Sequence, residues 1–141
     1  MYFDTSVAVK LYCREEGSEE CEAIAIAADG FYSSELFYGE LYAALLAKER
    51  AGAISKHLRE DVWRLFEEQL TDGRVQLITL NGIIVREATE VMGEVHPQVP
   101  LRTLDAIHLA TYLSVDAGPL FTRDKRMLEA ARRLNIPLAG A

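Results

Sequence analysis

Short apolar runs alternate with longer stretches of helical periodicity along the chain. The runs at residues 1–3, 31–33, 75–80, 120–122 and 136–138 predict β-strands, because each is brief and bounded by turn-forming or polar residues. The stretches between them place apolar residues three and four positions apart, as amphipathic helices do. Strands that alternate with helices indicate an α/β domain, with a mainly parallel sheet of four or five strands flanked by helices.

The predicted helices begin at capping residues and end at glycine, proline or asparagine. Ser34 is the expected cap of the third helix, Gly52 separates the third from the fourth, and Pro97 with Pro100 stops the fifth. No linker, repeat or low-complexity segment interrupts the pattern, so residues 1–141 are expected to form a single domain. The first helix is expected from about residue 7, the second contains residues 23–28, and the others are expected over residues 35–51, 55–71, 83–95, from 103 onward, and 125–134.

Composition narrows the class of protein. The net charge of −7 argues against a protein that coats nucleic acid through bulk electrostatics, since such binding relies on Lys and Arg. No stretch reaches the roughly 20 apolar residues of a membrane-spanning helix. A cytoplasmic location without membrane contact is therefore expected. Cys13 and Cys21, both placed in predicted helices, are expected to be free thiols, because no second cysteine pair or histidine cluster completes a zinc site.

Two acidic residues come within two positions of the end of a predicted strand. Asp4 comes after the first strand and Asp124 after the fourth. Ligands of open parallel sheets bind beyond the carboxyl ends of the strands, so polar residues at these points are candidates for chemistry. Each aspartate also precedes a helix, and an N-cap role worth about 1 kcal/mol would explain either residue taken singly.

Two further acids lie on predicted helices. At 100° per residue, Glu40 falls within an apolar stripe, where an uncompensated charge is costly; an edge position that reaches water is the alternative. Asp105 stands in the first turn of its helix, where the macrodipole favours an acid by ~0.3–1 kcal/mol. Its neighbours His108 and Tyr112 are expected to pack rather than to act in chemistry. The stripe around Glu40 consists of Leu36, Phe37, Ala43, Ala44 and Ala47.

Taken together, the four acids indicate one shared site. Three of them start helices at one edge of a parallel sheet, and the fourth points into apolar surroundings. Like charges gathered in this way raise one another's pKa unless a cation compensates them. Carboxylate oxygens suit Mg²⁺ or Mn²⁺, which lower the pKa of attacking water and stabilise charge on a leaving oxygen. The pattern therefore indicates metal-dependent phosphoryl chemistry.

Four segments carry a family resemblance: DTSVAVKLY, SSELFYGELYAALL, LDAIHLA and FTRDKRMLEAA. In order and spacing they resemble the successive motifs of PIN-domain ribonucleases, specifically the VapC-type toxins of bacterial and archaeal toxin–antitoxin systems. Each motif is short, but the set is specific and covers the chain from Met1 to about Leu138. The resemblance implies a three-layer α/β/α PIN-like fold and a Mg²⁺- or Mn²⁺-dependent endoribonuclease.

The resemblance also implies roles for individual residues. Thr5 stands beside the first aspartate and Thr122 precedes the last one, where both would orient carboxylates or a water molecule. Asp124 occupies the family's most tolerant position, with a second ion or the attacking water as its expected partner. The implied catalytic and metal-binding residues are Asp4, Glu40, Asp105 and Asp124.

Partners follow from the same resemblance. It implies a homodimer, an RNA substrate, and a cognate antitoxin whose tail lies in or near the acidic groove. The segment from Leu120 onward carries five basic residues against two acids, a local net charge of +3 in an acidic chain. We therefore expect an RNA-binding rim formed by Lys10, Arg14, Arg102, Arg123, Lys125 and Arg126.

Other interpretations predict different residues. A phosphoacceptor receiver domain has adjacent acids after its first strand and an aspartate after a middle strand, whereas Thr5 follows Asp4 here and Asn81 follows VQLITL. A haloacid-dehalogenase-like phosphatase has a second acid where Ser6 stands. A PIN-like module that binds RNA or an antitoxin without cleaving stays open, because the acids are necessary for catalysis but not sufficient.

Overall fold

The computed structural model describes residues 1–140, which form seven α-helices, one 3₁₀ helix and a four-stranded parallel sheet. The strands are β1 (Tyr2–Phe3), β2 (Phe31–Ser34), β3 (Val75–Ile78) and β4 (Leu120–Phe121), in the order β3-β2-β1-β4. The helices are α1 (Thr5–Ala8), η1 (Val9–Leu11), α2 (Ser18–Ala27), α3 (Leu36–Arg50), α4 (Lys56–Asp72), α5 (Gly82–Val95), α6 (Thr103–Leu113) and α7 (Lys125–Arg133). Each of these helices lacks the combination of length and hydropathy that spanning a bilayer requires.

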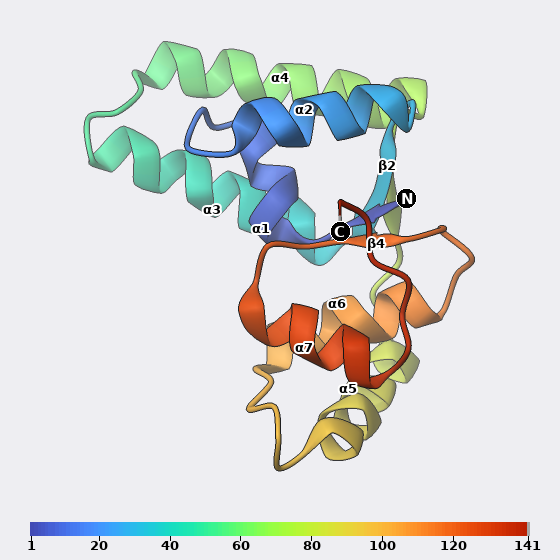
Figure 1. The fold of residues 1–141 in the computed structure, drawn as a ribbon. Helices are drawn as coiled ribbons and strands as arrows, with labels where there is room; N and C mark the ends of the chain where they lie inside the picture. The colour runs from blue at the N-terminus through green and yellow to red at the C-terminus, as the bar shows by residue number, and fades with distance from the viewer. Residues whose placement is uncertain (141) are drawn as a thin grey trace.

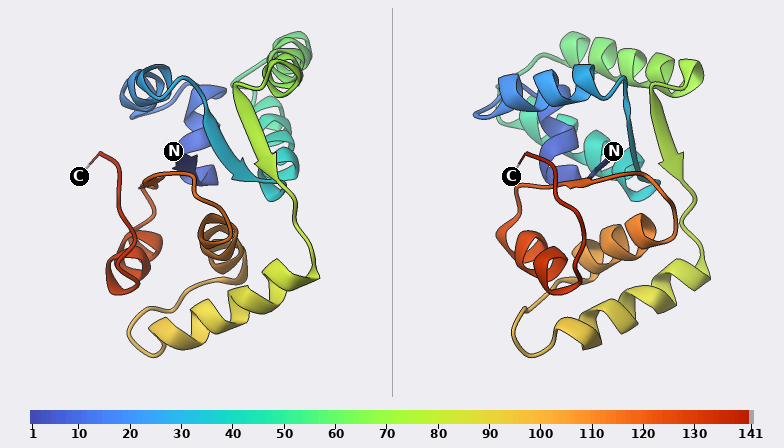
Figure 2. Two further views of the ribbon diagram at one scale, coloured as in Figure 1. Left: turned by 90° about the vertical axis from the view of Figure 1, so that its right-hand side faces the viewer. Right: turned by 45° about the vertical axis from the view of Figure 1, so that its right-hand side comes forward.

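The sheet separates two layers of helices (Figure 1). Helices α1 to α4 cover one face and α5 to α7 cover the other, as the turned views of Figure 2 also show. Alternation along β1 explains the division, because Tyr2 packs with residues of α5 to α7 whereas Phe3 packs beneath α1 to α4. Leu120 and Phe121 of β4 divide in the same way. The predicted three-layer α/β/α fold is thus confirmed.

The last predicted strand, at residues 136–138, is reduced to a single bridge. Leu138 pairs with Leu120, whose N–H donates to the Pro137 carbonyl at 2.9 Å, and the Ala139 N–H donates back to Leu120 at 2.8 Å. Pro137 has no N–H with which to extend the ladder. The prediction of a fifth strand was therefore wrong, although a four-stranded sheet among residues 1–140 lies within the predicted range.

Several element boundaries also differ from the predicted ones. Ser34 ends β2, and Glu35 takes the N-cap position of α3, although the Ser34 hydroxyl still accepts the first N–H of that helix at 3.1 Å. Helix α6 begins at Thr103, as predicted, and its N-cap residue, Arg102, makes no side-chain capping bond. Cys13 lies just after η1, outside any helix. Both Cys13 and Cys21 are buried free thiols, as expected.

A glycine is required where β2 begins beside β3. Gly30 has a φ of +106°, and a Cβ atom there would stand 2.1 Å from the carbonyl oxygen of Arg74. We expect Gly30→Ala to lower the free energy of unfolding by more than the roughly 1–2 kcal/mol of left-handed backbone strain alone, because the strand pairing prevents Arg74 from moving away. Gly52→Ala is the matched control, since Gly52 has a φ of +75° and no atom within 4 Å of the added Cβ. Urea unfolding measures both losses, and equal losses would contradict the expectation.

Candidate active site

The carboxyl ends of β1 and β4 bring two predicted site residues together. The strands pair in parallel with Phe3 opposite Phe121, so the next residues, Asp4 and Thr122, leave the sheet side by side. The Thr122 hydroxyl donates to Asp4 Oδ2 at 2.7 Å, and each of the two residues is only 2% exposed. This position is where parallel sheets place their ligand sites.

Three hydrogen-bond donors hold the carboxylate of Asp4. Besides Thr122, the Ser6 hydroxyl donates to Oδ1 at 2.7 Å and the Val7 N–H at 3.3 Å. Each hydroxyl accepts a backbone N–H from residues 123–124 at 3.1 Å, which leaves its own proton for the carboxylate. Burial raises the pKa of Asp4 above 3.8, although the Ser6 and Thr122 hydrogen bonds act to lower it. Asp4 therefore has one fixed orientation while its ionised form stays costly.

Glu40 lies at the edge of the face of α3 that packs into the core. The buried residues of that face are Phe37, Leu41 and Leu45. The side chain of Glu40 keeps 26% of its surface exposed, and Ala43 and Ala47 of the predicted stripe are exposed as well. The interpretation of Glu40 as a residue inside an apolar stripe was therefore wrong, and the edge position is the observed one.

Two donors from other elements hold the carboxylate of Glu40. The Thr5 hydroxyl donates to Oε1 at 2.7 Å, and Nε2 of His108 stands 2.9 Å from the same oxygen. Partial burial acts to raise the pKa of Glu40, but the hydrogen bond and charge of His108 and the Thr5 hydrogen bond outweigh it, so the pKa falls below 4.5. The carboxylate of Glu40 is thus ionised at neutral pH.

Asp105 and Asp124 share a cationic partner. Nε of Arg102 donates to Asp105 Oδ2 at 3.1 Å, and Nη2 of Arg102 stands 3.7 Å from Asp124 Oδ2. Asp124 also caps α7 by accepting the N–H of Met127 at 2.9 Å. The Arg102 side chain is 63% exposed, so these ion pairs contribute about 0–1 kcal/mol and open readily.

Three of the four acids are connected through neighbouring residues, and Glu40 is held separately by Thr5 and His108. Thr122 links Asp4 to Asp124, and Arg102 links Asp124 to Asp105. Among residues 1–140, no three Asp, Glu, His or Cys side chains are gathered closely enough to hold a metal ion as they are oriented here. The donor set still fits a hard divalent cation, because all four side chains offer the carboxylate oxygens that Mg²⁺ and Mn²⁺ prefer.

Three residues outside the predicted set take part in this network. Ser6 and His108 are spaced two and three residues from Asp4 and Asp105, and this spacing is the signal that could have found them. The hydroxyl of Tyr2 stands 2.8 Å from Nδ1 of His108. Tyr2 gives no such signal, because a tyrosine in a buried strand looks like an ordinary core residue.

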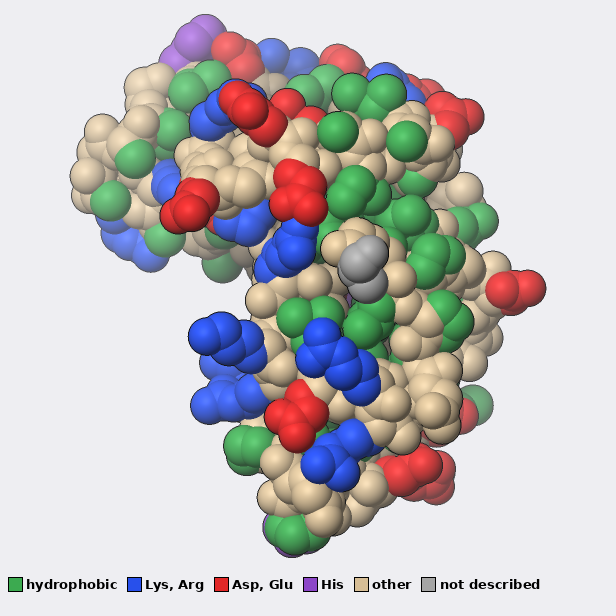
Figure 3. Space-filling model, in the orientation of Figure 1, with side chains coloured by type: hydrophobic (Ala, Val, Ile, Leu, Met, Phe, Trp, Pro, Cys, Tyr) green, Lys and Arg blue, Asp and Glu red, His purple; other side chains and the backbone are tan. Residues whose placement is uncertain are grey.

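The predicted basic rim divides into paired and unpaired cations. Four of its residues form ion pairs: Lys10 with Glu15, Arg14 with Glu19 and Glu22, Arg102 with Asp105 and Asp124, and Arg123 with Glu20. Lys125 and Arg126, in the first turn of α7, are exposed and have no ion-pair partner within residues 1–140; Arg132 of the same helix shares both properties. Figure 3 shows Lys and Arg side chains gathered over α7.

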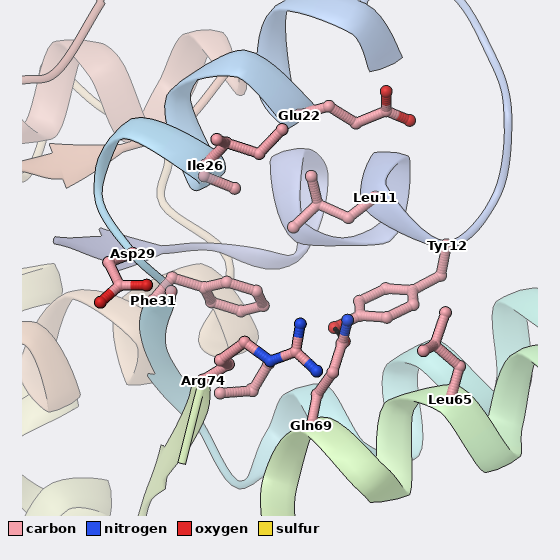
Figure 4. A pocket seen from close by; sticks show the side chains of 12 residues that line it. Leu11, Tyr12, Glu22, Ile26, Asp29, Phe31, Leu65, Gln69 and Arg74 are labelled. Atoms are coloured by element: carbon pink, nitrogen blue, oxygen red, sulfur yellow. Dashed lines mark hydrogen bonds between the residues drawn. The ribbon is translucent and has the colours of Figure 1, made fainter. Parts of the chain in front are cut away.

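A recess of about 450 Å³ opens at the opposite edge of the sheet (Figure 4). It lies where Phe31 and Val75 begin β2 and β3, and Tyr12, Gln69 and Arg74 also line it. The Tyr12 hydroxyl donates to Gln69 Oε1 across it at 2.6 Å. The four acids do not line this recess, so it is separate from the candidate active site.

Residues 1–133 match the PIN domain family. Ribonuclease VapC46 of Mycobacterium tuberculosis is 34% identical to the chain over 139 residues, which cover 96% of the chain and 93% of that relative. Ribonucleases VapC45 and VapC49 of the same species are each 33% identical over 143 residues, which cover the whole chain and 95% of each relative. The likeness therefore extends over every segment that carries one of the four acids.

Proposed function

Because the chain belongs to the PIN domain family, together with the VapC ribonucleases, we propose that it is a metal-dependent endoribonuclease and the toxin of a toxin–antitoxin pair. It would hydrolyse RNA phosphodiester bonds, in the cytoplasm. The observation that carries the proposal is Asp4, a buried carboxylate at the carboxyl edge of the sheet. Hydroxyl and amide donors surround it, and within residues 1–140 no Lys or Arg forms an ion pair with it. A bound divalent cation would compensate that charge.

The four acids would have different roles in the proposed reaction. Asp4, Glu40 and Asp105 would hold Mg²⁺ or Mn²⁺, and Asp124 would help to hold a second ion or position the attacking water. A divalent cation, when bound, lowers the pKa of water and stabilises negative charge on the leaving oxygen. Hydrolysis would leave 3′-hydroxyl and 5′-phosphate ends.

Neighbouring residues would keep the carboxylates oriented. Ser6 and Thr122 donate to different oxygens of Asp4, which fixes the plane of the carboxylate. Thr5 holds one oxygen of Glu40. Arg102 would leave Asp105 and Asp124 when a cation enters, and its exposed side chain could then turn toward an RNA phosphate.

The test is an RNA cleavage assay with the purified chain. Single-stranded and structured RNAs are incubated with Mg²⁺, with Mn²⁺ and with EDTA, and the ends of the products are identified. We expect cleavage with either metal and none in EDTA. RNA binding without metal-dependent cleavage of any RNA would instead favour a non-cleaving PIN-like module.

Lys125 and Arg126 offer a test of the proposed RNA-binding rim. We expect the Lys125→Ala, Arg126→Ala double variant to bind RNA more weakly and to show a shallower salt dependence, by roughly 0.7 in the log–log slope for each lost phosphate contact. The Arg50→Ala, Arg86→Ala double variant changes the net charge equally at exposed positions on α3 and α5. For each double variant, fluorescence anisotropy titrations at several salt concentrations measure the affinity for RNA and its salt dependence. Equal effects of the two double variants would remove α7 from the rim.

We also propose that the protein is a homodimer that binds a cognate antitoxin, as its relation to the VapC family implies. Light scattering of the purified chain measures the oligomeric state. Co-purification with the product of a neighbouring small gene tests the antitoxin. A monomer that retains no such product would contradict both parts.

A further inference from the structure

The buried imidazole of His108 connects the core to one of the proposed metal ligands. His108 lies on α6 and is 3% exposed. Its Nε2 atom stands 2.9 Å from Oε1 of Glu40 and 3.0 Å from the hydroxyl of Thr5, and its Nδ1 atom stands 2.8 Å from the hydroxyl of Tyr2. Both ring nitrogens therefore have partners, and each partner belongs to a different element.

The hydrogen-bond network assigns the proton on Nε2. The carboxylate of Glu40 can only accept, and Thr5 has already given its one hydroxyl proton to Glu40 at 2.7 Å. Both atoms that face Nε2 are thus acceptors, so this nitrogen carries hydrogen. Nδ1 accepts from the Tyr2 hydroxyl in the neutral ring and donates to that hydroxyl in the imidazolium, so this bond holds the ring orientation in either form.

The Nε2 proton of His108 affects the orientation of the Glu40 carboxylate. Its Oε1 atom receives donors from Thr5 and His108, whereas its Oε2 atom has no hydrogen-bond partner within residues 1–140. Two donors on one oxygen restrict rotation of the carboxylate and leave the other oxygen available. We propose that His108, supported by Tyr2, is a positioning residue that holds Glu40 with Oε2 turned out as a cation ligand. This inference rests on the proposed metal-dependent function.

A purely packing role for His108 makes a different prediction. Tyr2 meets His108 edge-on with ring centroids 6.0 Å apart, and it meets Tyr112 in the same way at 5.9 Å. A ring of similar size would preserve these aromatic contacts without any hydrogen bond. Under that interpretation, His108→Phe would leave cation binding unchanged.

Direct Mn²⁺ binding by the full chain, followed by electron paramagnetic resonance, separates the two roles. We expect His108→Phe to weaken binding roughly 10–100-fold, the usual effect of removing a partner that orients a ligand. His108→Gln keeps an N–H donor near the position of Nε2 and should recover most of the affinity. Tyr2→Phe should fall between the two. Tyr112→Phe is the matched control, because it also loses one hydroxyl bond, to the Gly118 carbonyl at 2.9 Å, without removing a hydrogen bond of His108.

The outcomes are distinguishable. If the wild-type chain binds no Mn²⁺, the proposed function and this inference both fail. If the wild-type chain binds Mn²⁺ and His108→Phe binds it equally well, only the positioning role of His108 is overturned. If circular dichroism shows that His108→Phe is unfolded, His108→Gln and Tyr2→Phe decide: affinity of Tyr2→Phe equal to that of Tyr112→Phe overturns the role, and a lower affinity supports it.

Discussion

Asp4→Asn is expected to abolish RNA cleavage while leaving the metal-free protein at least as stable as the wild type. Asparagine keeps the shape of the side chain and caps a helix as well as aspartate does, so the loss of charge is the main change. The amide oxygen can take the Oδ1 position and accept from Ser6 and Val7, and the Thr122 hydroxyl can rotate to accept from the amide nitrogen at the Oδ2 position. Losing a metal ligand removes several kcal/mol of transition-state stabilisation, or roughly 10²–10⁴-fold in rate.

The direction of the stability change follows from the pKa of Asp4. Burial raises this pKa above 3.8 in the folded protein, so the group favours folding only while it is protonated, and that contribution is lost as the pH rises through the folded pKa. Above the folded pKa the ionised carboxylate opposes folding. In EDTA we expect Asp4→Asn to unfold at the same or a higher urea concentration, with the difference shrinking as the pH falls toward 3.8.

Added Mn²⁺ should reverse this order. A cation that binds only the folded state stabilises it by mass action, and the variant would lose that gain together with the ligand. Thermal unfolding with and without Mn²⁺ measures the difference. Undiminished cleavage by purified Asp4→Asn would leave Asp4 with no role beyond the N-cap of α1.

Asp105→Asn is expected to abolish cleavage as well, with little loss of stability. Its two structural roles are modest, because complementing the dipole of α6 and pairing with the exposed Arg102 are each worth about 0.3–1 kcal/mol or less. Either role alone predicts an active variant. A ligand role predicts a rate loss on the scale expected for Asp4→Asn.

Glu19→Gln is the matched control for Asp105→Asn. Glu19 is also an acid in the first turn of a helix, α2, and it pairs with Arg14 at 3.0 Å, as Asp105 does with Arg102 at 3.1 Å. Cleavage rates and urea unfolding are measured for both variants. Similar small effects of the two substitutions on cleavage would exclude Asp105 from the proposed metal site.

The site was predictable to different degrees at different residues. Asp4 and Asp124 could be placed at the carboxyl ends of strands, because a strand and the residue after it are local features of the sequence. The surroundings of Glu40 were misjudged, since periodicity indicates which residues share a helix face but not how deep the edge of that face lies. His108 was interpreted as packing, because its contact with Glu40 joins residues 68 positions apart.

The sequence by itself determined the alternation of strands and helices, the mainly parallel sheet, and the kinds of side chain available for chemistry. These properties depend on local periodicity and on residue type. Only the tertiary structure decided that β1 lies beside β4, that Arg102 bridges Asp105 and Asp124, and that Pro137 reduces a predicted strand to one bridge. These contacts join segments that are distant in the sequence. A local sequence pattern therefore cannot predict which carboxylate oxygen accepts from which hydrogen-bond donor.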